Sequence, residues 1–147
     1  MGDFIVRQAT EHDSRFIIAL IHAVQINPTG LDWNRFMVAM TLDGVLAGCG
    51  QIKIHSDGSR ELASLAVKEE FRGQGLARRI IERLVDGKPR PIFLMCRSRL
   101  GSLFQKFGFV PVEWDEMTPY FRRIYHLARI AGLIIRKGDK LLVMRLD

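Results

Sequence analysis

The chain has 147 residues, 48% apolar and 26% charged, which is the composition and size of one ordinary globular domain. Its net charge is +6, and no apolar run approaches the roughly 18 residues that a membrane-spanning helix needs, so we expect no membrane span and no membrane partner. No secretory signal pattern opens the sequence, and its two cysteines, Cys49 and Cys96, lie in apolar runs. We therefore expect a cytoplasmic protein with reduced, buried thiols.

The positive charge is concentrated toward the C-terminal end. Residues 119–147 contain seven Arg or Lys against two Asp, whereas residues 1–118 contain fifteen basic against fourteen acidic residues. A basic segment at about 113–147 is compatible with a nucleic-acid partner. A solvated helix face explains the same charge, and we favour that interpretation.

The first part of the chain predicts a strand and a helix. Residues 4–8 are short and apolar, as in a strand. Apolar residues then recur at helical spacing over 11–26, after Thr10, which has a suitable side chain for an N-cap. The segment 27–30, Asn-Pro-Thr-Gly, is expected to end this helix.

Three strands are predicted next, over residues 36–42, 45–55 and 61–67. Asp43-Gly44 separates the first two and Asp57-Gly58 the last two, and both dipeptides are hairpin turn signals. These segments therefore indicate an antiparallel meander.

The pattern then changes to strand, helix, strand. A helix over 76–85 lies between the strand at 61–67 and a buried strand at 91–96, and such a crossover joins parallel strands. The remaining predicted elements are a short helix within 100–107, a strand at 109–112, a basic helix at 119–131 and a β-prone segment at 133–144 with a possible turn at Gly138-Asp139. The sequence predicts a single α/β (α+β) domain over 1–147, with one mixed sheet that is antiparallel at the front and parallel in the middle.

The segment Arg72-Gly-Gln-Gly-Leu-Ala77 opens the helix that follows the third meander strand. The first turn of a helix has backbone N–H groups without intrahelical partners, and the helix dipole adds partial positive charge there. Glycines at 73 and 75 permit positive φ angles and a close approach of a ligand. We therefore expect a phosphate or pyrophosphate site. Arg78 stands where a dinucleotide-binding fingerprint requires a third glycine, and no P-loop lysine follows.

Two motifs at a suitable separation resemble the GNAT superfamily of acyl-CoA-dependent N-acyltransferases. Residues 72–77 fit that family's Gln/Arg-x-x-Gly-x-Gly/Ala pattern. Residues 104–109, Phe-Gln-Lys-Phe-Gly-Phe, match its Tyr-x-Lys-x-Gly-Phe signature except at the first position. The order of elements also agrees, over roughly residues 3–112, while residues 113–147 fit only loosely.

The resemblance implies a splayed central sheet flanked by helices, with acetyl-CoA as co-substrate. The pantetheine arm would lie between the strands at 61–67 and 91–96, and the pyrophosphate on the amides after Arg72. For Arg78, a phosphate contact and a surface pair with Glu82 are equally open. The residues expected to bind the coenzyme are Leu65, Ala66, Val67, Arg72, Gly73, Gln74, Gly75, Leu76, Ala77, Arg78 and Phe104.

The implied reaction is direct attack of an amine on the thioester, which requires a proton acceptor. Glu61, at the start of the third meander strand, is the first candidate for this base. His55, at the end of the preceding strand, could lie across the turn from it and is the second candidate. A surface glutamate paired with Arg60 or Lys53 is the alternative interpretation of Glu61.

The expected proton donor is missing, because Phe104 stands where the family usually has Tyr. Another hydroxyl could replace it, from Ser98, Ser102, Tyr120 or Tyr125. The thiolate could also leave without an enzyme acid, or the domain could bind acyl-CoA without turning it over. We favour unaided departure, since a thiol has an ordinary pKa near 8.5.

The partners expected are acetyl-CoA and an amine that the sequence does not identify, bound to a monomer or homodimer. The substrate pocket should lie between the first helix with residues 27–35 and the segment 113–125. Neither the four histidines nor the two cysteines show ligand spacing, so no metal is expected. The rival hypotheses are a non-catalytic acyl-CoA-binding module and a nucleic-acid binder that uses the basic C-terminal segment.

Overall fold

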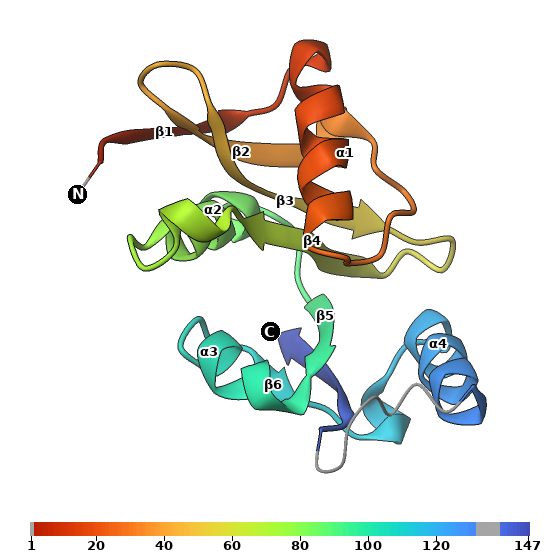
Figure 1. Ribbon diagram of the computed structural model, residues 1–147. Helices are drawn as coiled ribbons and strands as arrows, with labels where there is room; N and C mark the ends of the chain where they lie inside the picture. Colours follow the sequence, from red (N-terminus) through yellow and green to blue (C-terminus); the bar gives the residue numbers. More distant parts are fainter. Residues whose placement is uncertain (1, 132–138) are drawn as a thin grey trace. The chain divides into compact units, whose positions relative to one another are not determined.

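Seven strands form the sheet in this computed structural model, which describes residues 2–131 and 139–147. They are hydrogen-bonded in the order β1-β2-β3-β4-β5-β7-β6. Figure 1 shows the strands and helices coloured along the sequence. The neighbours β1–β2, β2–β3, β5–β7 and β6–β7 are antiparallel, while β4 and β5 are parallel. The mixed sheet predicted from the sequence is thus confirmed. The strands are β1 Phe4–Gln8, β2 Phe36–Thr41, β3 Leu46–Ile54, β4 Arg60–Val67, β5 Ile92–Arg97, β6 Val110–Pro111 and β7 Leu141–Leu146.

Internal contacts divide the chain into two units. Unit 1 comprises Met1–Lys53 and Leu62–Lys88, and unit 2 comprises Ile54–Glu61 and Pro89–Asp147. The boundary passes through β4, whose first two residues belong to unit 2 and whose remainder belongs to unit 1. A single domain over 1–147 stays a prediction.

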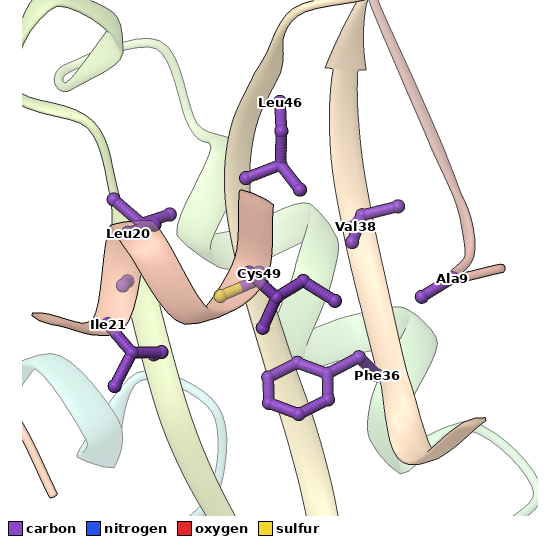
Figure 2. Packing of buried hydrophobic residues seen from close by; sticks show 9 residues of the cluster. Ala9, Leu20, Ile21, Phe36, Val38, Leu46 and Cys49 are labelled. Carbon is purple, nitrogen blue, oxygen red and sulfur yellow. The ribbon is translucent and has the colours of Figure 1, made fainter. Parts of the chain in front are cut away.

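The core of unit 1 lies between helix α1 (Ser14–Ala23) and the strands β2 and β3 (Figure 2). Three residues of α1 at helical spacing, Ile17, Leu20 and Ile21, are buried, as the apolar pattern predicted. They pack with a cluster that includes Phe36 of β2 and Cys49 of β3. Each fully buried side chain of this size contributes about 1.5–3 kcal/mol to folding.

Helix α1 ends three residues earlier than the sequence predicted. It follows a 3-10 turn at Glu11–Asp13 and stops at Ala23, because Gln25 adopts a left-handed conformation with φ of +58°. The N–H of Ile26 then donates to the carbonyl oxygen of Ile21 at 3.4 Å, which closes a Schellman-type cap. Glycine is the usual residue at this position, so glutamine gave no stop signal.

Helix α2 (Leu76–Val85) packs on the face of β3 opposite to α1, and two glycines of β3 determine how closely the helix approaches the strand. A Cβ atom at Gly48 would lie 3.0 Å from the carbonyl oxygen of Ala66 and 3.1 Å from Ile80 Cδ1. One at Gly50 would lie 3.0 Å from Ile80 Cγ2. Cys49, between the two glycines, points into the α1 core, as expected for alternating strand residues. The missing side chains thus let α2 approach the sheet.

Two arginines on one face of α2 fix this helix to β1. Arg79 Nη2 donates to the carbonyl oxygen of Phe4 at 3.1 Å, and Arg83 Nη1 donates to that of Val6 at 2.9 Å. Together with the glycine contacts, these bonds hold α2 in a defined place within unit 1.

Unit 2 is built around β5 and β7, with helices α3 (Gly101–Gln105) and α4 (Pro119–Ile130). The two strands pair antiparallel from Ile92 opposite Leu146 to Arg97 opposite Leu141. The buried core consists of Phe93, Val112, Met117, Phe121 and Val143. The predicted basic helix is therefore present as α4, and β7 covers the end of the predicted β-prone segment.

Some predictions fall on residues that the structure does not describe. The start of the β-prone segment, the turn residue Gly138 and the basic pair Arg136-Lys137 lie outside the described residues. Across residues 2–131 and 139–147, the helices are all too short or too polar to cross a membrane.

Candidate functional site

The glycines of the predicted anion loop have the conformations that the sequence suggested. Gly73 and Gly75 have φ angles of +80° and +76°, a region that residues with a Cβ atom rarely adopt. A Cβ atom built on either residue would meet nothing within 4 Å. The two glycines are thus required by the backbone conformation, and the space beside them is open.

Helix α2 begins directly after this loop, with Gly75 as its N-cap. Its first i→i−4 bond runs from the N–H of Arg79 to the carbonyl oxygen of Gly75 at 3.2 Å, so the amides of Leu76 and Ala77 precede the ladder. Such amides point along the helix axis and, with the dipole of a ten-residue helix, favour an anion. The loop can therefore bind a phosphate or pyrophosphate group through its main chain.

The side chains around the loop are held by neighbours within unit 1. Arg72 Nε donates to the carbonyl oxygen of Val67 at 3.0 Å, and the side-chain oxygen of Gln74 accepts from the N–H of Gly2 at 3.1 Å. Arg78 Nη1 lies 3.6 Å from Glu82 Oε1, which is the surface pair considered from the sequence. Leu76 is buried and anchors the start of α2 in the core.

Strand β4 contains an irregular residue that sequence reasoning did not anticipate. Ser64 has a left-handed φ of +56°, a conformation that costs a residue with a Cβ atom on the order of 1 kcal/mol or more. Gln51, fully buried on β3, donates from Nε2 to Ser64 Oγ at 2.9 Å and to the carbonyl oxygen of Gly30 at 3.0 Å. Ser64 directly precedes the predicted coenzyme-binding residues Leu65, Ala66 and Val67 in β4. Ala66 is buried, and Leu65 and Val67 are half-buried.

The two candidate bases meet within unit 2. His55 Nε2 lies 2.7 Å from Glu61 Oε1, and their side chains are 12% and 13% exposed. Lys53, one of the two alternative partners of Glu61, instead donates from Nζ to the carbonyl oxygen of Thr29 at 3.0 Å. A hydrogen-bonded imidazole and carboxylate can hold and transfer a proton.

Two aromatic rings contact His55. The ring of Tyr120, in the first turn of α4, stacks on His55 with centroids 3.5 Å apart and planes 11° apart. Phe121 contacts His55 edge-on at 5.9 Å and stacks on Phe93 at 4.8 Å. Burial and the nearby negative charge of Glu61 raise the pKa of Tyr120, so its hydroxyl keeps its proton at neutral pH.

A polar network fixes the start of α4 against the turn at 55–59. Asp57 Oδ2 accepts from the backbone N–H of Tyr120 at 2.9 Å, and Ser59 Oγ donates to Thr118 Oγ1 at 2.7 Å. Burial alone would raise the pKa of Asp57, but hydrogen bonds from Ser59, Tyr120 and Thr118 outweigh it and lower that pKa to about 2. The network thereby holds Tyr120 over His55.

The remaining hydroxyl candidates lie in other surroundings. Phe104 is only 8% exposed and its ring meets Phe109 edge-on at 6.3 Å. Ser98 Oγ is engaged with Asp139 Oδ1 at 3.1 Å, and Tyr125 meets Trp114 at 6.2 Å between ring centroids. Tyr120 is therefore the candidate hydroxyl that lies beside Glu61 and His55.

Neither cysteine is activated. Burial raises the pKa of the Cys49 thiol to about 12, and burial together with the charge of Asp139 raises that of Cys96 to about 11. Among residues 2–131 and 139–147, no three or more His, Cys, Asp or Glu side chains are grouped so that they could hold a metal ion. The absence of a metal stays a prediction.

Comparison with known protein families identifies the fold. The model of the acetyltransferase (GNAT) domain matches residues 32–111, more than half of the chain. The chain belongs to the GNAT family of acetyltransferases. The matched part of this GNAT domain contains the glycine loop, His55 and Glu61. A comparison with curated protein sequences finds no match.

Solved structures show the same fold. N-acetylglutamate synthase from Neisseria gonorrhoeae, solved with coenzyme A and N-acetyl-glutamate, has a TM-score of 0.75 at 24% identity, over 100% of this chain and 36% of that one. The GNAT domain thus spans about a third of that enzyme. Rv2747 from Mycobacterium tuberculosis, solved with CoA, has a TM-score of 0.72 at 23% identity. The similarity covers 97% of this chain and 98% of that one. Escherichia coli ElaA has a TM-score of 0.68 at 16% identity, and the similarity covers 100% of both chains. These similarities confirm the predicted GNAT-like fold.

Proposed function

We propose that this GNAT domain transfers the acetyl group of acetyl-CoA to an amine. The observation that carries the proposal is the pair of left-handed glycines, Gly73 and Gly75, that open the amide end of α2. This arrangement suits the diphosphate of coenzyme A, and the family supplies acetyl transfer as the general chemistry. The amine acceptor and its identity are part of the proposal.

Direct transfer needs no enzyme nucleophile, in keeping with the unactivated cysteines. The free amine attacks the thioester carbon, the new C–N bond forms, and the C–S bond then breaks to release CoA. Holding the two reactants together can contribute on the order of 7–11 kcal/mol to lowering the barrier. The protein must also accept the proton that leaves the nitrogen, and we assign this task to the pair Glu61 and His55.

The leaving thiolate does not require a side-chain acid, because thiols ordinarily ionise near pH 8.5. Phe104 has no proton to donate and is nearly buried. Tyr120 retains its proton and lies beside Glu61, which makes it the hydroxyl to test as a substitute. We expect departure of the thiolate to proceed without it.

A non-catalytic acyl-CoA-binding module is the second candidate function. The observation that favours it is Phe104 at the position where the family usually carries Tyr. The nucleic-acid hypothesis has less support, since Arg122 of the basic helix donates to the carbonyl oxygens of Trp114 at 2.9 Å and Asp115 at 2.8 Å. That arginine is committed to its own unit.

The test combines ligand binding with turnover. Acetyl-CoA should raise the melting temperature, and free thiol should appear when an amine from a panel is added. The panel should include L-glutamate and L-arginine, because Neisseria gonorrhoeae N-acetylglutamate synthase was solved with N-acetyl-glutamate and with L-arginine. Binding without thiol release for any amine would favour the binding module, and no binding would contradict both functions.

A further inference from the structure

The hydrogen bond between Glu61 and His55 determines which nitrogen of the neutral imidazole carries the proton. A carboxylate can only accept hydrogen bonds. The 2.7 Å contact of Glu61 Oε1 with His55 Nε2 therefore places the ring hydrogen on Nε2. In a neutral imidazole, the other nitrogen, Nδ1, then has the free lone pair.

No group in the described part of the chain forms a hydrogen bond with Nδ1 of His55. The His55 ring contacts Glu61 through Nε2, Tyr120 through its face and Phe121 through an edge. Its Nδ1 makes no hydrogen bond to residues 2–131 or 139–147. The side chain of His55 is 12% exposed. Nδ1 is thus an acceptor that the fold leaves unused.

We propose that His55 Nδ1 is the proton acceptor of the transferase reaction and that Glu61 is a positioning residue acting through Nε2. This inference rests on the proposed function and reverses the order in which the sequence ranked the two side chains. It assigns Glu61 the role of fixing the tautomer and orientation of the imidazole. Histidine is the side chain that most often acts as a general base, and the lone pair of Nδ1 is the position that can accept the proton.

The ring of His55 lies among acidic and aromatic groups. Glu61 places a negative charge at Nε2, and the face of Tyr120 lies parallel to the ring at 3.5 Å, where an aromatic ring attracts a cation. Asp57 and Arg123 act on Tyr120 from the turn and from α4, with opposite charges. Phe121 and Phe93 contribute only apolar edges and faces.

The proton and electron balance is complete without another reagent. The substrate ammonium first loses one proton to water, and the free amine attacks the acetyl carbon. The second proton on nitrogen moves to His55 Nδ1 as the C–S bond breaks and its electron pair leaves with sulfur. The thiolate takes a proton from water, and the imidazolium returns its proton to water, so the products are the amide and free CoA thiol.

The first experiment is the pH dependence of kcat/KM with an alkyl amine. Its logarithm should rise with slope two below the imidazole range and slope one above it, because two protons must leave. In His55→Gln, kcat/KM should fall by roughly 10²–10⁴ and the slope should be one throughout. Glu61→Gln should retain the change of slope with a reduced rate. His126→Gln, at an exposed position on α4, is the matched control and should match the wild type.

The second experiment needs no acetyl-CoA or amine. Long-range ¹⁵N–¹H NMR of the free protein reports which imidazole nitrogen has the proton. At pH 8, His55 should be in the Nε2–H form, with an unprotonated Nδ1. Glu61→Gln should alter that tautomer signature, while Glu69→Gln, an exposed glutamate, should leave it unchanged.

The outcomes separate this inference from the proposed function. An Nδ1–H form of His55 in the wild type overturns the inference, as does a change of slope that survives His55→Gln but disappears in Glu61→Gln. A protein that releases no thiol with any amine counts against the transferase function. The tautomer measurement then still decides whether Glu61 positions the imidazole.

Discussion

The glycine loop of unit 1 and the His55–Glu61 pair of unit 2 are built in opposite ways. The loop offers main-chain amides in open space, and its side chains are tied to other parts of the unit. The pair consists of two nearly buried side chains that contact each other and are covered by the ring of Tyr120. In our proposal, the loop binds the coenzyme through its main chain, and the pair supplies proton transfer through side chains.

This difference determines how each region tolerates change. In the loop, the left-handed backbone of Gly73 and Gly75 disfavours any residue with a Cβ atom. In the pair, His55 directly follows β3 and Glu61 lies in β4, and each side chain depends on the other, six positions away. Substitutions at the two regions should therefore separate binding from turnover.

The largest effect is expected from Gly75→Glu. This change places a carboxylate where the anion would bind and strains a left-handed residue, so acetyl-CoA should no longer bind. At acetyl-CoA concentrations 100 times its dissociation constant, the wild type should gain about 2.7 kcal/mol of stability and the variant none. Thermal melting with and without ligand measures this difference.

Gly44→Glu is the matched control for that variant. Gly44 lies in the β2–β3 hairpin, has a φ of +88° and has no atom within 4 Å of a Cβ position, like Gly75. It should show a similar loss of stability from backbone strain but retain the full response to acetyl-CoA. A normal response in Gly75→Glu would show that the loop is not the binding site.

The second prediction separates the ring of Tyr120 from its hydroxyl. Tyr120→Phe keeps the stacking on His55, so turnover should remain within about threefold of the wild type if no hydroxyl acid is needed. Tyr120→Leu removes the aromatic face and should lower kcat by roughly tenfold. Thiol release at saturating acetyl-CoA gives both values. A large loss in Tyr120→Phe would instead identify its hydroxyl as the proton donor.

Local sequence signals predicted the loop, because its information lies in six consecutive residues. Gly73 and Gly75 indicate left-handed backbone directly, and the apolar spacing after Leu76 indicates the helix that provides the dipole. The strands around the two hairpins were predicted to within one or two residues for the same reason. Turn glycines and alternating side chains act over short distances.

The unpredicted features depend on long-range contacts or on residues in uncommon conformations. Tyr120 reaches His55 only because Asp57 accepts its backbone N–H, and these residues are separated by 63 positions. The strand β7 pairs between β5 and β6, a choice that no local pattern specifies. Gln25 and Ser64 adopt left-handed backbone conformations that their residue types disfavour.

The third prediction tests the packing that positions the loop. Gly48→Ala would bring a Cβ atom to 3.0 Å from the carbonyl oxygen of Ala66, so strand or helix must shift. We expect a loss of about 1–3 kcal/mol in the free energy of unfolding, measured by urea denaturation. In Gly58→Ala, the new Cβ atom would have no atom within 4 Å. The loss of free energy of unfolding should be smaller there, because the only penalty comes from the φ of +85°. Equal losses would contradict the close packing of α2 on β3.

The smallest effect concerns acid stability. Since its hydrogen bonds lower the pKa of Asp57 to about 2, its carboxylate stabilises the folded state fully above the ordinary range near 3.9. That contribution should disappear as the pH falls toward 2. In Asp57→Asn, the free energy of unfolding should therefore decline less between pH 4 and pH 2 than in the wild type. An identical decline in both proteins would show that the Asp57 network does not contribute.

The most direct test of the account follows the backbone amides during a titration with acetyl-CoA. In ¹H–¹⁵N NMR spectra, the signals of Gly73, Gly75 and Ala77 should move strongly and saturate together, while that of Gly44 should stay in place. This result would show that the open amide end of α2 binds the coenzyme. Saturable binding that leaves the signals of residues 73–77 unchanged would contradict it.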